Sequence, residues 1–222
     1  MFEPADVTAT RAAYDTVAAD YAELLRDELS AKPLDRAMLA AFAEQVHTGG
    51  GDAVADLGCG PGRVTAQLAD LGLDAFGVDL SPGMIAVARA QHPALRFEVG
   101  TMAALELADG SLDGAVAWYS IIHTPLERQD ALFSEFARVL RPGGWLLLAF
   151  QLGDEVISVR HAYGHDIELD AYRQPPERVR GLLAGAGFAE YAWLTRQPVS
   201  GERSQQAYVL AQRGRPGGSP EL

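Results

Sequence analysis

The chain has 222 residues and a mass of 23.7 kDa, which predicts one domain, or one domain with a small lid. Hydrophobic residues make up 48% of the chain, so it can bury a sizeable core and does not resemble a disordered chain. Eighteen basic residues against thirty acidic ones give a formal net charge of −12. Because such a surface repels nucleic-acid phosphates, we expect no nucleic-acid partner.

A single cysteine, Cys59, excludes an internal disulfide and a metal centre built from cysteines alone. The first residues lack the basic region and the long apolar core of a signal peptide. No apolar run approaches the ~20 residues that are needed to span a bilayer. We therefore expect a cytoplasmic protein without a membrane partner, and the sequence leaves the oligomeric state open.

Two helical patterns occupy the start of the chain. Apolar residues recur at helical spacing over residues 11–29 and again over residues 33–46. Three glycines at positions 49–51 end this region and supply a joint. We expect residues 1–50 to form a helical lid, with Tyr14 and Tyr21 directed towards a cleft beneath it.

From residue 52 onwards, short apolar runs alternate with helical patterns. We expect strands at residues 53–57, 75–78, 95–99, 113–118 and 145–150, with helices at 63–71, 82–91 and 126–140. Residues 151–172 show no regular pattern, and a helix at 177–186 precedes two closing strands at 188–195 and 205–211.

This alternation predicts an α/β fold of the Rossmann-like, doubly wound type. Its sheet is expected to have seven strands, mostly parallel, with an antiparallel final strand. We assign residues 51–212 to this domain and residues 213–222, which are rich in glycine and proline, to a flexible tail. Right-handed crossovers place the loops that follow the strands along one edge of the sheet, where ligands bind.

A glycine-rich loop lies between the first expected strand and its helix, with the sequence Asp56-Leu57-Gly58-Cys59-Gly60-Pro61-Gly62-Arg63. Glycines there permit a tight turn and a close approach of the backbone to a ligand. About twenty residues further on, Asp79 ends the next strand, where a carboxylate can accept hydrogen bonds from both hydroxyls of an adenosine ribose. The combination predicts a site for a nucleoside cofactor.

The loop departs from the Gly-x-Gly-x-x-Gly pattern of nicotinamide and flavin sites, since its third glycine comes one residue early and Arg63 follows. Asp56 would also place a negative charge beside a pyrophosphate. A ligand that carries an ammonium and a sulfonium suits these residues better than one that carries two phosphates. We therefore expect S-adenosylmethionine as the cofactor.

Residues 54–65 and 77–81 resemble the first two motifs of class I S-adenosylmethionine-dependent methyltransferases. The resemblance continues through residues 111–116 and 138–144, and the pattern Tyr14-Asp15-x-x-Ala18-x-x-Tyr21 is similar to the leading helix of small-molecule members. It implies the transfer of a methyl group to an O, N or C atom of a small-molecule acceptor. The resemblance does not identify the acceptor.

The same resemblance implies roles for individual residues. Asp56 and the backbone of residues 58–62 would hold the methionine end, and Asp79 the ribose, while Leu80 and Met84 would line the adenine. Residues 101–103 would meet the adenine edge, although Thr101 stands where many relatives have an aspartate. The implied cofactor-binding residues are Tyr14, Tyr21, Asp56, Gly58, Cys59, Gly60, Gly62, Arg63, Asp79, Leu80, Met84, Thr101, Met102, Ala103 and Trp118.

The end of the fourth strand supplies the candidate catalytic residues, Tyr119 and His123. Trp118 and Tyr119 are expected to wall the sulfonium, because aromatic faces attract cations. His123 is the candidate general base, since an ordinary histidine pKa lies near working pH. A role in bracing the following helix is the alternative for His123.

His161 and His165 are four residues apart, but Gly164 weakens a helix there and no third ligand is evident, so we expect no metal site; lining of the acceptor pocket is the alternative.

Two other interpretations of the function stay open at this point. A nicotinamide oxidoreductase would need a dyad such as Tyr-x-x-x-Lys, and the single lysine, Lys32, lies in the expected lid. A binding module that has lost catalysis is the remaining alternative.

Overall fold

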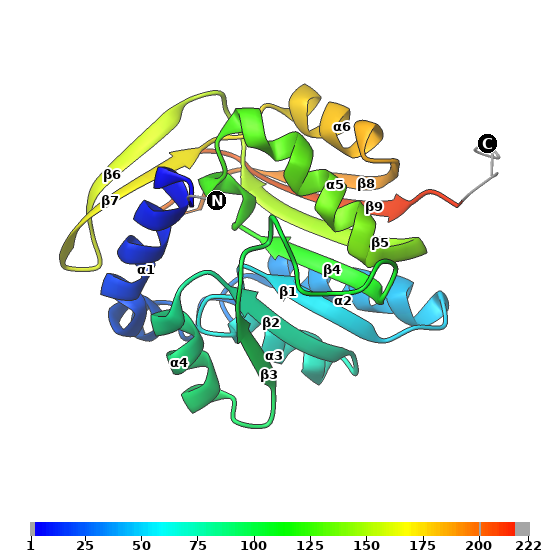
Figure 1. Cartoon of the computed structure of the whole chain (residues 1–222), viewed down its shortest axis with the longest axis horizontal. Helices are drawn as coiled ribbons and strands as arrows, with labels where there is room; N and C mark the ends of the chain where they lie inside the picture. Colours follow the sequence, from blue (N-terminus) through cyan, green and yellow to red (C-terminus); the bar gives the residue numbers. More distant parts are fainter. Residues whose placement is uncertain (1–2, 200, 216–222) are drawn as a thin grey trace.

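A computed structural model describes residues 3–199 and 201–215 of the chain. A seven-stranded sheet forms its centre, in the order β3-β2-β1-β4-β5-β9-β8 (Figure 1). Strand β9 is antiparallel to both of its neighbours, and the remaining neighbouring pairs are parallel. The strands are β1 (Ala53–Leu57), β2 (Asp74–Asp79), β3 (Arg96–Val99), β4 (Leu112–Trp118), β5 (Leu140–Gln151), β8 (Phe188–Arg196) and β9 (Gln206–Arg213). The predicted fold class, including the antiparallel final strand, is confirmed.

Helices cover both faces of this sheet, as Figure 1 shows. Side chains alternate along the buried strands, so that Ala115 and Ala117 of β4 face one core and Val116 and Trp118 face the other. Helices α5 (Gln129–Val139) and α6 (Pro176–Gly185) pack on the first face, and α2 (Pro33–Thr48) and α3 (Arg63–Asp70) on the second. The first residues of the helix expected at 126–140 form a 3₁₀ turn, Leu126–Arg128, and another 3₁₀ turn, Ile121–His123, lies before it.

Helix α2 is part of the core, and its assignment to a lid was wrong. Phe42 and Val46 are fully buried together with Val54. The contact with the sheet is so close that a Cβ on Gly114 would lie 2.6 Å from the Phe42 ring. An amphipathic helix can face a sheet as well as a cleft, so periodicity alone does not separate the two positions.

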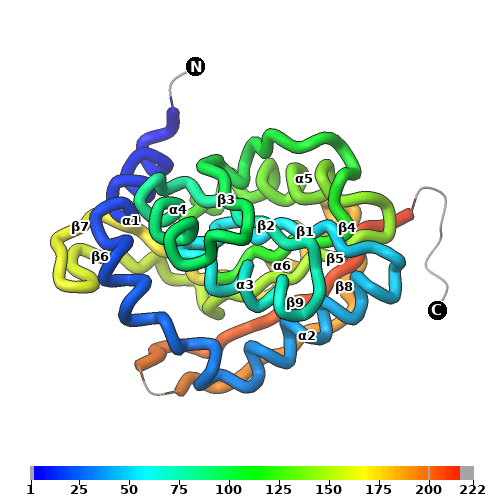
Figure 2. The backbone as a smooth tube through the Cα atoms, turned by 90° about the horizontal axis from the view of Figure 1, so that it is seen from below, coloured from blue at the N-terminus to red at the C-terminus, as the bar shows by residue number. Residues whose placement is uncertain are grey.

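Helix α1 (Ala5–Leu24) starts earlier and ends earlier than expected, and turns occupy residues 25–31. It lies beside α4 (Pro82–Gln91) at the end of the sheet where the parallel strands finish (Figures 1 and 2). The lid prediction therefore narrows to α1.

Residues 151–172 are not irregular as predicted, because most of them form a β-hairpin. Strands β6 (Val156–Ala162) and β7 (His165–Tyr172) pair antiparallel outside the main sheet and pack against α1. Tyr163 and Gly164 join them with φ values of 53° and 82°, as in the type I′ turns that suit the twist of a hairpin. Gly164 was interpreted as a helix breaker, whereas it is a turn residue.

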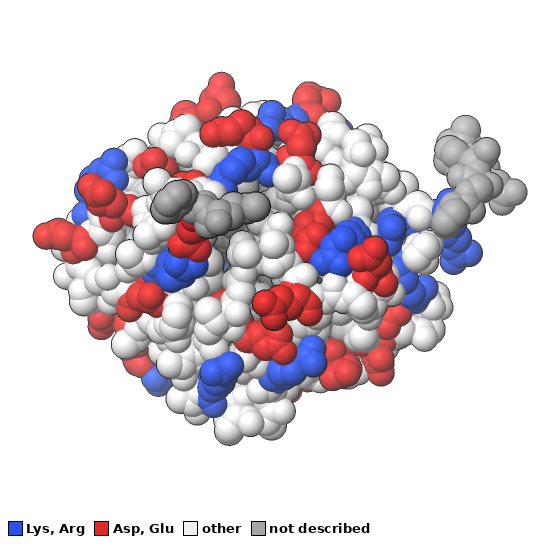
Figure 3. Space-filling model, in the orientation of Figure 1, with Lys and Arg blue, Asp and Glu red and all other residues white. Residues whose placement is uncertain are grey.

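No helix in residues 3–199 and 201–215 is both long enough and apolar enough to cross a membrane. Acidic and basic side chains are interspersed on the face shown in Figure 3, with uncharged surface between them. Of the predicted flexible tail, Arg213 ends β9, and residues 216–222 lie outside the described residues.

Candidate active site

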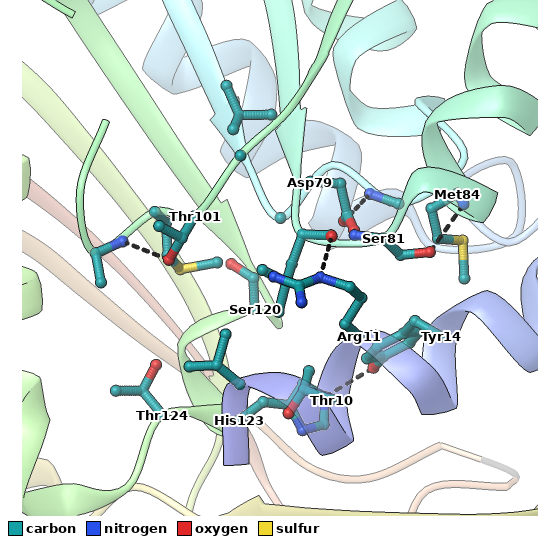
Figure 4. A pocket seen from close by; sticks show the side chains of 18 of the residues that line it. Thr10, Arg11, Tyr14, Asp79, Ser81, Met84, Thr101, Ser120, His123 and Thr124 are labelled. Atoms are coloured by element: carbon teal, nitrogen blue, oxygen red, sulfur yellow. Dashed lines mark hydrogen bonds between the residues drawn. The ribbon is translucent and has the colours of Figure 1, made fainter. Parts of the chain in front are cut away.

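A cavity of about 320 Å³ opens at the carboxyl ends of β1 to β4 (Figure 4). In the sheet, β2 and β3 lie on one side of β1, and β4 and β5 lie on the other, so the strand order reverses at β1. Ligands bind at such a switch point. Most of the residues predicted from the sequence line this cavity. They are Tyr14, Tyr21, Gly58, Gly60, Asp79, Leu80, Met84, Thr101, Met102, Ala103, Trp118, Tyr119 and His123.

The backbone of the glycine loop is already hydrogen-bonded within the protein. Gly58 and Cys59 both donate to the Val78 carbonyl, with N···O distances of 2.7 and 3.1 Å. Gly60 donates to Asp79 Oδ2 at 2.8 Å. A pyrophosphate site needs free N–H donors, and these three are occupied. These three residues therefore offer no free N–H group, which suits a cationic ligand better than a pyrophosphate.

Asp79 holds two loops together at the rim of the cavity. Its Oδ1 accepts from the Ser81 N–H at 2.9 Å, and its Oδ2 accepts the Gly60 bond. Burial raises the pKa of Asp79, and these two backbone bonds act against that rise. Each carboxylate oxygen keeps a further lone pair, so the group can also accept from ribose hydroxyls.

Asp56 is fully buried behind the loop and does not line the cavity. Its Oδ2 accepts from the Thr65 hydroxyl at 2.7 Å, whereas Oδ1 has no partner among the described residues. Burial raises its pKa to about 7. The Asp56 side chain thus lies outside the cavity lining, and its direct contact with the methionine end stays a prediction. Its negative charge can still favour a bound cation through the low-dielectric interior.

We expect Asp56→Asn to stabilise the cofactor-free protein at high pH. The folded carboxyl binds its proton up to about pH 7, against an ordinary pKa of 3.8, so stability falls as pH rises through this window and stays low above it. Asparagine removes the titration, and thermal melts at a series of pH values should show a gain that vanishes towards the acid end. Asp52→Asn, on an exposed neighbour, is the control. A gain in melting temperature that does not depend on pH would contradict a raised pKa of Asp56.

Three predicted cofactor residues, Cys59, Gly62 and Arg63, have structural roles outside the first cavity, and their contacts with the cofactor stay predictions. The Cys59 side chain is buried against Phe97, and burial raises the pKa of its thiol. A Cβ on Gly62 would lie 2.7 Å from the Phe97 ring, so this glycine allows α3 to pack closely. Arg63 forms an ion pair with Glu28 at 2.5 Å and lines a different cavity. None of the three contributes a side chain to the first cavity.

His123 is held between α1 and the hairpin. Its Nδ1 lies 3.0 Å from the Asp170 carbonyl oxygen, and its Nε2 lies 2.7 Å from the Tyr14 hydroxyl. Since a carbonyl can only accept, Nδ1 carries the proton, Tyr14 donates its hydroxyl proton to Nε2, and Nε2 is the acceptor. Burial lowers the pKa of His123, which keeps the ring neutral. The side chain therefore presents a basic nitrogen, and its partners are α1 and β7 rather than the following helix.

Tyr119 cannot act through its hydroxyl in this arrangement. That hydroxyl is buried beside Tyr208, which itself donates to Asp35 at 2.5 Å, and burial raises the pKa of Tyr119 far above its usual range. The ring forms part of the cavity wall and packs edge-on against Trp118 with centroids 6.0 Å apart. The hydroxyl of Tyr119 is therefore not available for proton transfer, whereas its ring is at the cavity wall, and its role beside the sulfonium stays a prediction.

Several site residues were missed because their contacts join distant parts of the chain. Arg11 donates from Nε to the Leu80 carbonyl at 3.3 Å (Figure 4). Asp15 accepts from the Ser81 hydroxyl at 2.6 Å and from the Gly83 N–H at 2.8 Å. These bonds fix α1 to the start of α4, across the cavity mouth. The Ser81-Pro82 pair indicates a helix start, but no local signal indicates its partner in α1.

The Thr101 hydroxyl accepts from the Ala103 N–H at 3.2 Å and stabilises a turn at the cavity edge. His161 and His165 do not lie together at a metal site: His161 bonds to Asp166 and His165 to Asp20. No group of three or more histidine, cysteine or acidic side chains that could hold a metal occurs in the described part of the chain.

A second cavity, of about 460 Å³, lies between α1, the β6–β7 hairpin and the ends of the sheet. Four residues line both cavities, namely Tyr14, Tyr21, Tyr119 and His123. Three of them are aromatic and the fourth is the basic imidazole. They form a partition between the two spaces.

Comparison with known proteins gives a family. Residues 54–144 match the family described as "Methyltransferase domain". A demethylmenaquinone methyltransferase from Beutenbergia cavernae is 36% identical over 136 residues, which cover 61% of this chain and 55% of the relative. A trans-aconitate 2-methyltransferase from Methylobacterium nodulans is 32% identical over 173 residues, which cover 74% of this chain and 64% of the relative. The chain thus spans between half and two thirds of the length of these curated relatives.

Among solved structures, a magnesium protoporphyrin IX methyltransferase from Synechocystis PCC 6803 with bound S-adenosylmethionine has the same fold. Its TM-score is 0.72 at 18% identity, and the match covers 96% of this chain and 100% of that one. Residues 54–144 thus belong to the family of methyltransferase domains, and the chain has the fold of an S-adenosylmethionine-dependent methyltransferase. The resemblance read from its motifs is confirmed.

Proposed function

We propose that this protein transfers a methyl group from S-adenosylmethionine to a small-molecule acceptor, with the cofactor in the first cavity and the acceptor in the second. The partition between the two cavities carries this proposal, because it sets a basic imidazole and three aromatic rings where two ligands would meet. Such a partition aligns reactants and excludes water, which is the main contribution of a protein to methyl transfer.

The first cavity fits the cofactor in shape and in charge. Gly60 adopts a φ of +54°, and a Cβ there would have only the Tyr21 ring, at 3.9 Å, within contact range. The glycine thus leaves room for a ligand. Asp79 would accept from the ribose, Leu80 and Met84 would line the adenine, and the unpaired Asp56 carboxylate oxygen would favour the positive end.

The bound cofactor supplies an electrophilic methyl group on a sulfonium. The chain's own part is to place the acceptor and to receive its proton where one is lost. Nε2 of His123 is the basic atom at the partition, and the proton would reach it directly or through the Tyr14 hydroxyl. As the new bond to the methyl carbon forms, the carbon–sulfur bond breaks and its electron pair stays on sulfur.

The experiment that tests the cofactor is isothermal titration of the folded protein with S-adenosylmethionine, S-adenosylhomocysteine and NADH. We expect the two adenosyl compounds to bind and NADH not to bind, because the loop N–H groups are occupied. Heat from NADH alone would instead support the oxidoreductase alternative.

Substitution of His123 tests the base. We expect His123→Gln to lower kcat by about a hundredfold or more with an acceptor that loses a proton, while the affinity for S-adenosylhomocysteine is unchanged. Because burial holds the His123 pKa below 6.5, kcat/KM of the native protein should stay level at neutral pH and fall only on the acid side of that value. Tyr14→Phe should cause a smaller loss. Full activity of His123→Gln would limit the histidine to a structural role.

Further expectations rest on composition alone. A net charge of −12 and the interspersed charges of Figure 3 favour a small molecule over nucleic acid as the acceptor. A cytoplasmic location stays a prediction, and the oligomeric state stays open.

A further inference from the structure

The hairpin presents an apolar wall to the second cavity. Ile157 pairs with Ala171, and Val159 pairs with Leu169, and all four side chains line the cavity. Alternation along β7 directs residues 167, 169 and 171 to the same face. This wall faces apolar residues of α1, so the body of any occupant is in contact with hydrocarbon on two sides.

The same alternation ends on a basic residue. Arg173 follows β7 on the cavity face, and its N–H bonds to the Glu155 carbonyl at 3.0 Å, which continues the hairpin pairing. Only 17% of the Arg173 side chain is exposed. Its ion-pair partner, the Glu155 carboxylate, is 55% exposed and does not line the cavity. The guanidinium is thus at the root of the hairpin, where the apolar wall meets the sheet.

Basic side chains outnumber acidic ones around this cavity, in a chain with twelve more acidic than basic residues. Both acidic side chains are already paired. Glu28 bonds to Lys32 at 2.7 Å and to Arg63 at 2.5 Å, and Glu202 bonds to Lys32 at 3.2 Å and to Arg196. The remaining basic residues of the cavity, Arg173 and Arg203, have no acidic partner within it. This end of the cavity can therefore hold an anionic group of a ligand.

We propose that the acceptor is an amphipathic organic acid, with an apolar body on the hairpin wall, its carboxylate at Arg173 and Arg203, and its methylated atom beside His123. This inference rests on the proposed function. His123 bonds to the carbonyl of Asp170, and three residues of extended chain separate Asp170 from Arg173, or about 10 Å at 3.3 Å per residue. The acid therefore has the length of a short chain or of a single ring with a side arm.

Calorimetry on the full chain saturated with S-adenosylhomocysteine tests this class without any reaction. The probes are matched pairs, 4-hydroxycinnamate with 4-hydroxycinnamamide and 10-hydroxydecanoate with 10-hydroxydecanamide, each of which differs only in the charge of one end. We expect at least one acid to bind about tenfold more tightly than its amide, as one charge-assisted contact implies. Equal binding within both pairs, or no binding by any of the four, overturns the proposal.

Variants assign the preference to the arginine. Arg173→Gln should abolish the difference between acid and amide, while Arg160→Gln, an exposed position on the same hairpin outside this cavity, should keep it. Glu155→Gln breaks the ion pair but leaves the guanidinium, so the acid should bind at least as tightly as before. If Glu155→Gln lost the preference for the acid over the amide as fully as Arg173→Gln, the role of Arg173 would be structural. That result would overturn the proposed contact between Arg173 and the carboxylate.

The first titration separates the two proposals. If S-adenosylhomocysteine binds and the acids show no preference, the acceptor class is wrong and the methyltransferase proposal stands. If S-adenosylhomocysteine itself does not bind, the proposed function fails.

Discussion

Replacing Asp79 with alanine is expected to weaken the binding of S-adenosylhomocysteine by about a hundredfold or more. A carboxylate at this position can accept two ribose hydroxyls, and each hydrogen bond to a charged group contributes about 1.5–3 kcal/mol, where 1.4 kcal/mol is tenfold in affinity. The alanine also removes the acceptor that fixes the Gly60 N–H at 2.8 Å. Titration calorimetry of the variant measures the loss directly.

Asp74→Ala provides the matched control, because Asp74 is at the other end of the same strand and is exposed. Its affinity should equal that of the native protein. Burial raises the pKa of Asp79, so the fold gains little from this carboxylate and the alanine variant should still melt cooperatively. A folded Asp79→Ala protein with native affinity would place the ribose elsewhere.

The centre of the sheet could be predicted because strands β1, β4 and β5 are buried on both faces. Such strands are continuous apolar runs, and residues 53–57 match β1 exactly in extent. The glycines and Asp79 could be placed for the same reason: the glycines follow β1 and Asp79 is the last residue of β2, and local sequence defines the end of both strands. Boundaries were less accurate where turns extend an element, as at α5, which begins only after two 3₁₀ turns.

The hairpin was missed because its pattern is weak: β6 is mostly exposed, and only the short β7 alternates between buried and exposed residues. Its apolar residues face a cavity and α1, and exposed residues such as Val156 interrupt the pattern. The sequence did contain one indication of a hairpin: apolar and acidic residues alternate over 167–170, shortly after the Tyr163-Gly164 pair. Tyrosine is unusual at a positive φ, and here its ring contacts Tyr21 with centroids 5.1 Å apart. A tertiary contact thus accompanies a turn that local sequence does not favour.

The attachment of α1 over the site depends on contacts over long sequence distances. Arg11 and Leu80 are 69 residues apart, and Tyr14 and His123 are 109 apart. A single sequence contains no information on such pairs beyond the types of the residues. His123 could be proposed as a base from its chemistry, but its tautomer follows only from the Asp170 carbonyl and the Tyr14 hydroxyl that contact it.

Gly58→Ala is expected to destabilise the fold by about 2–5 kcal/mol. The residue has a φ of +77°, which costs a non-glycine residue about 1–2 kcal/mol. An added Cβ would also lie 2.3 Å from the Ser120 Cβ, and such overpacking costs about 1–3 kcal/mol more. Ser120 cannot easily move, because its hydroxyl donates to the Leu57 carbonyl at 2.6 Å. Denaturant unfolding of the cofactor-free protein measures the loss.

Alanine substitutions at two further glycines distinguish the cost of backbone strain from the cost of steric crowding. Gly187→Ala, at φ +81° with nothing within 4 Å of the new methyl group, should show the cost of the backbone alone. Gly60→Ala, at φ +54°, should lose a similar amount of stability, yet its methyl group would enter the cofactor cavity. We therefore expect Gly60→Ala to lose affinity for S-adenosylhomocysteine while Gly187→Ala keeps it. If Gly58→Ala were no less stable than Gly187→Ala, the loop would not pack against β4 as described, and the position of the cofactor cavity would have to be revised.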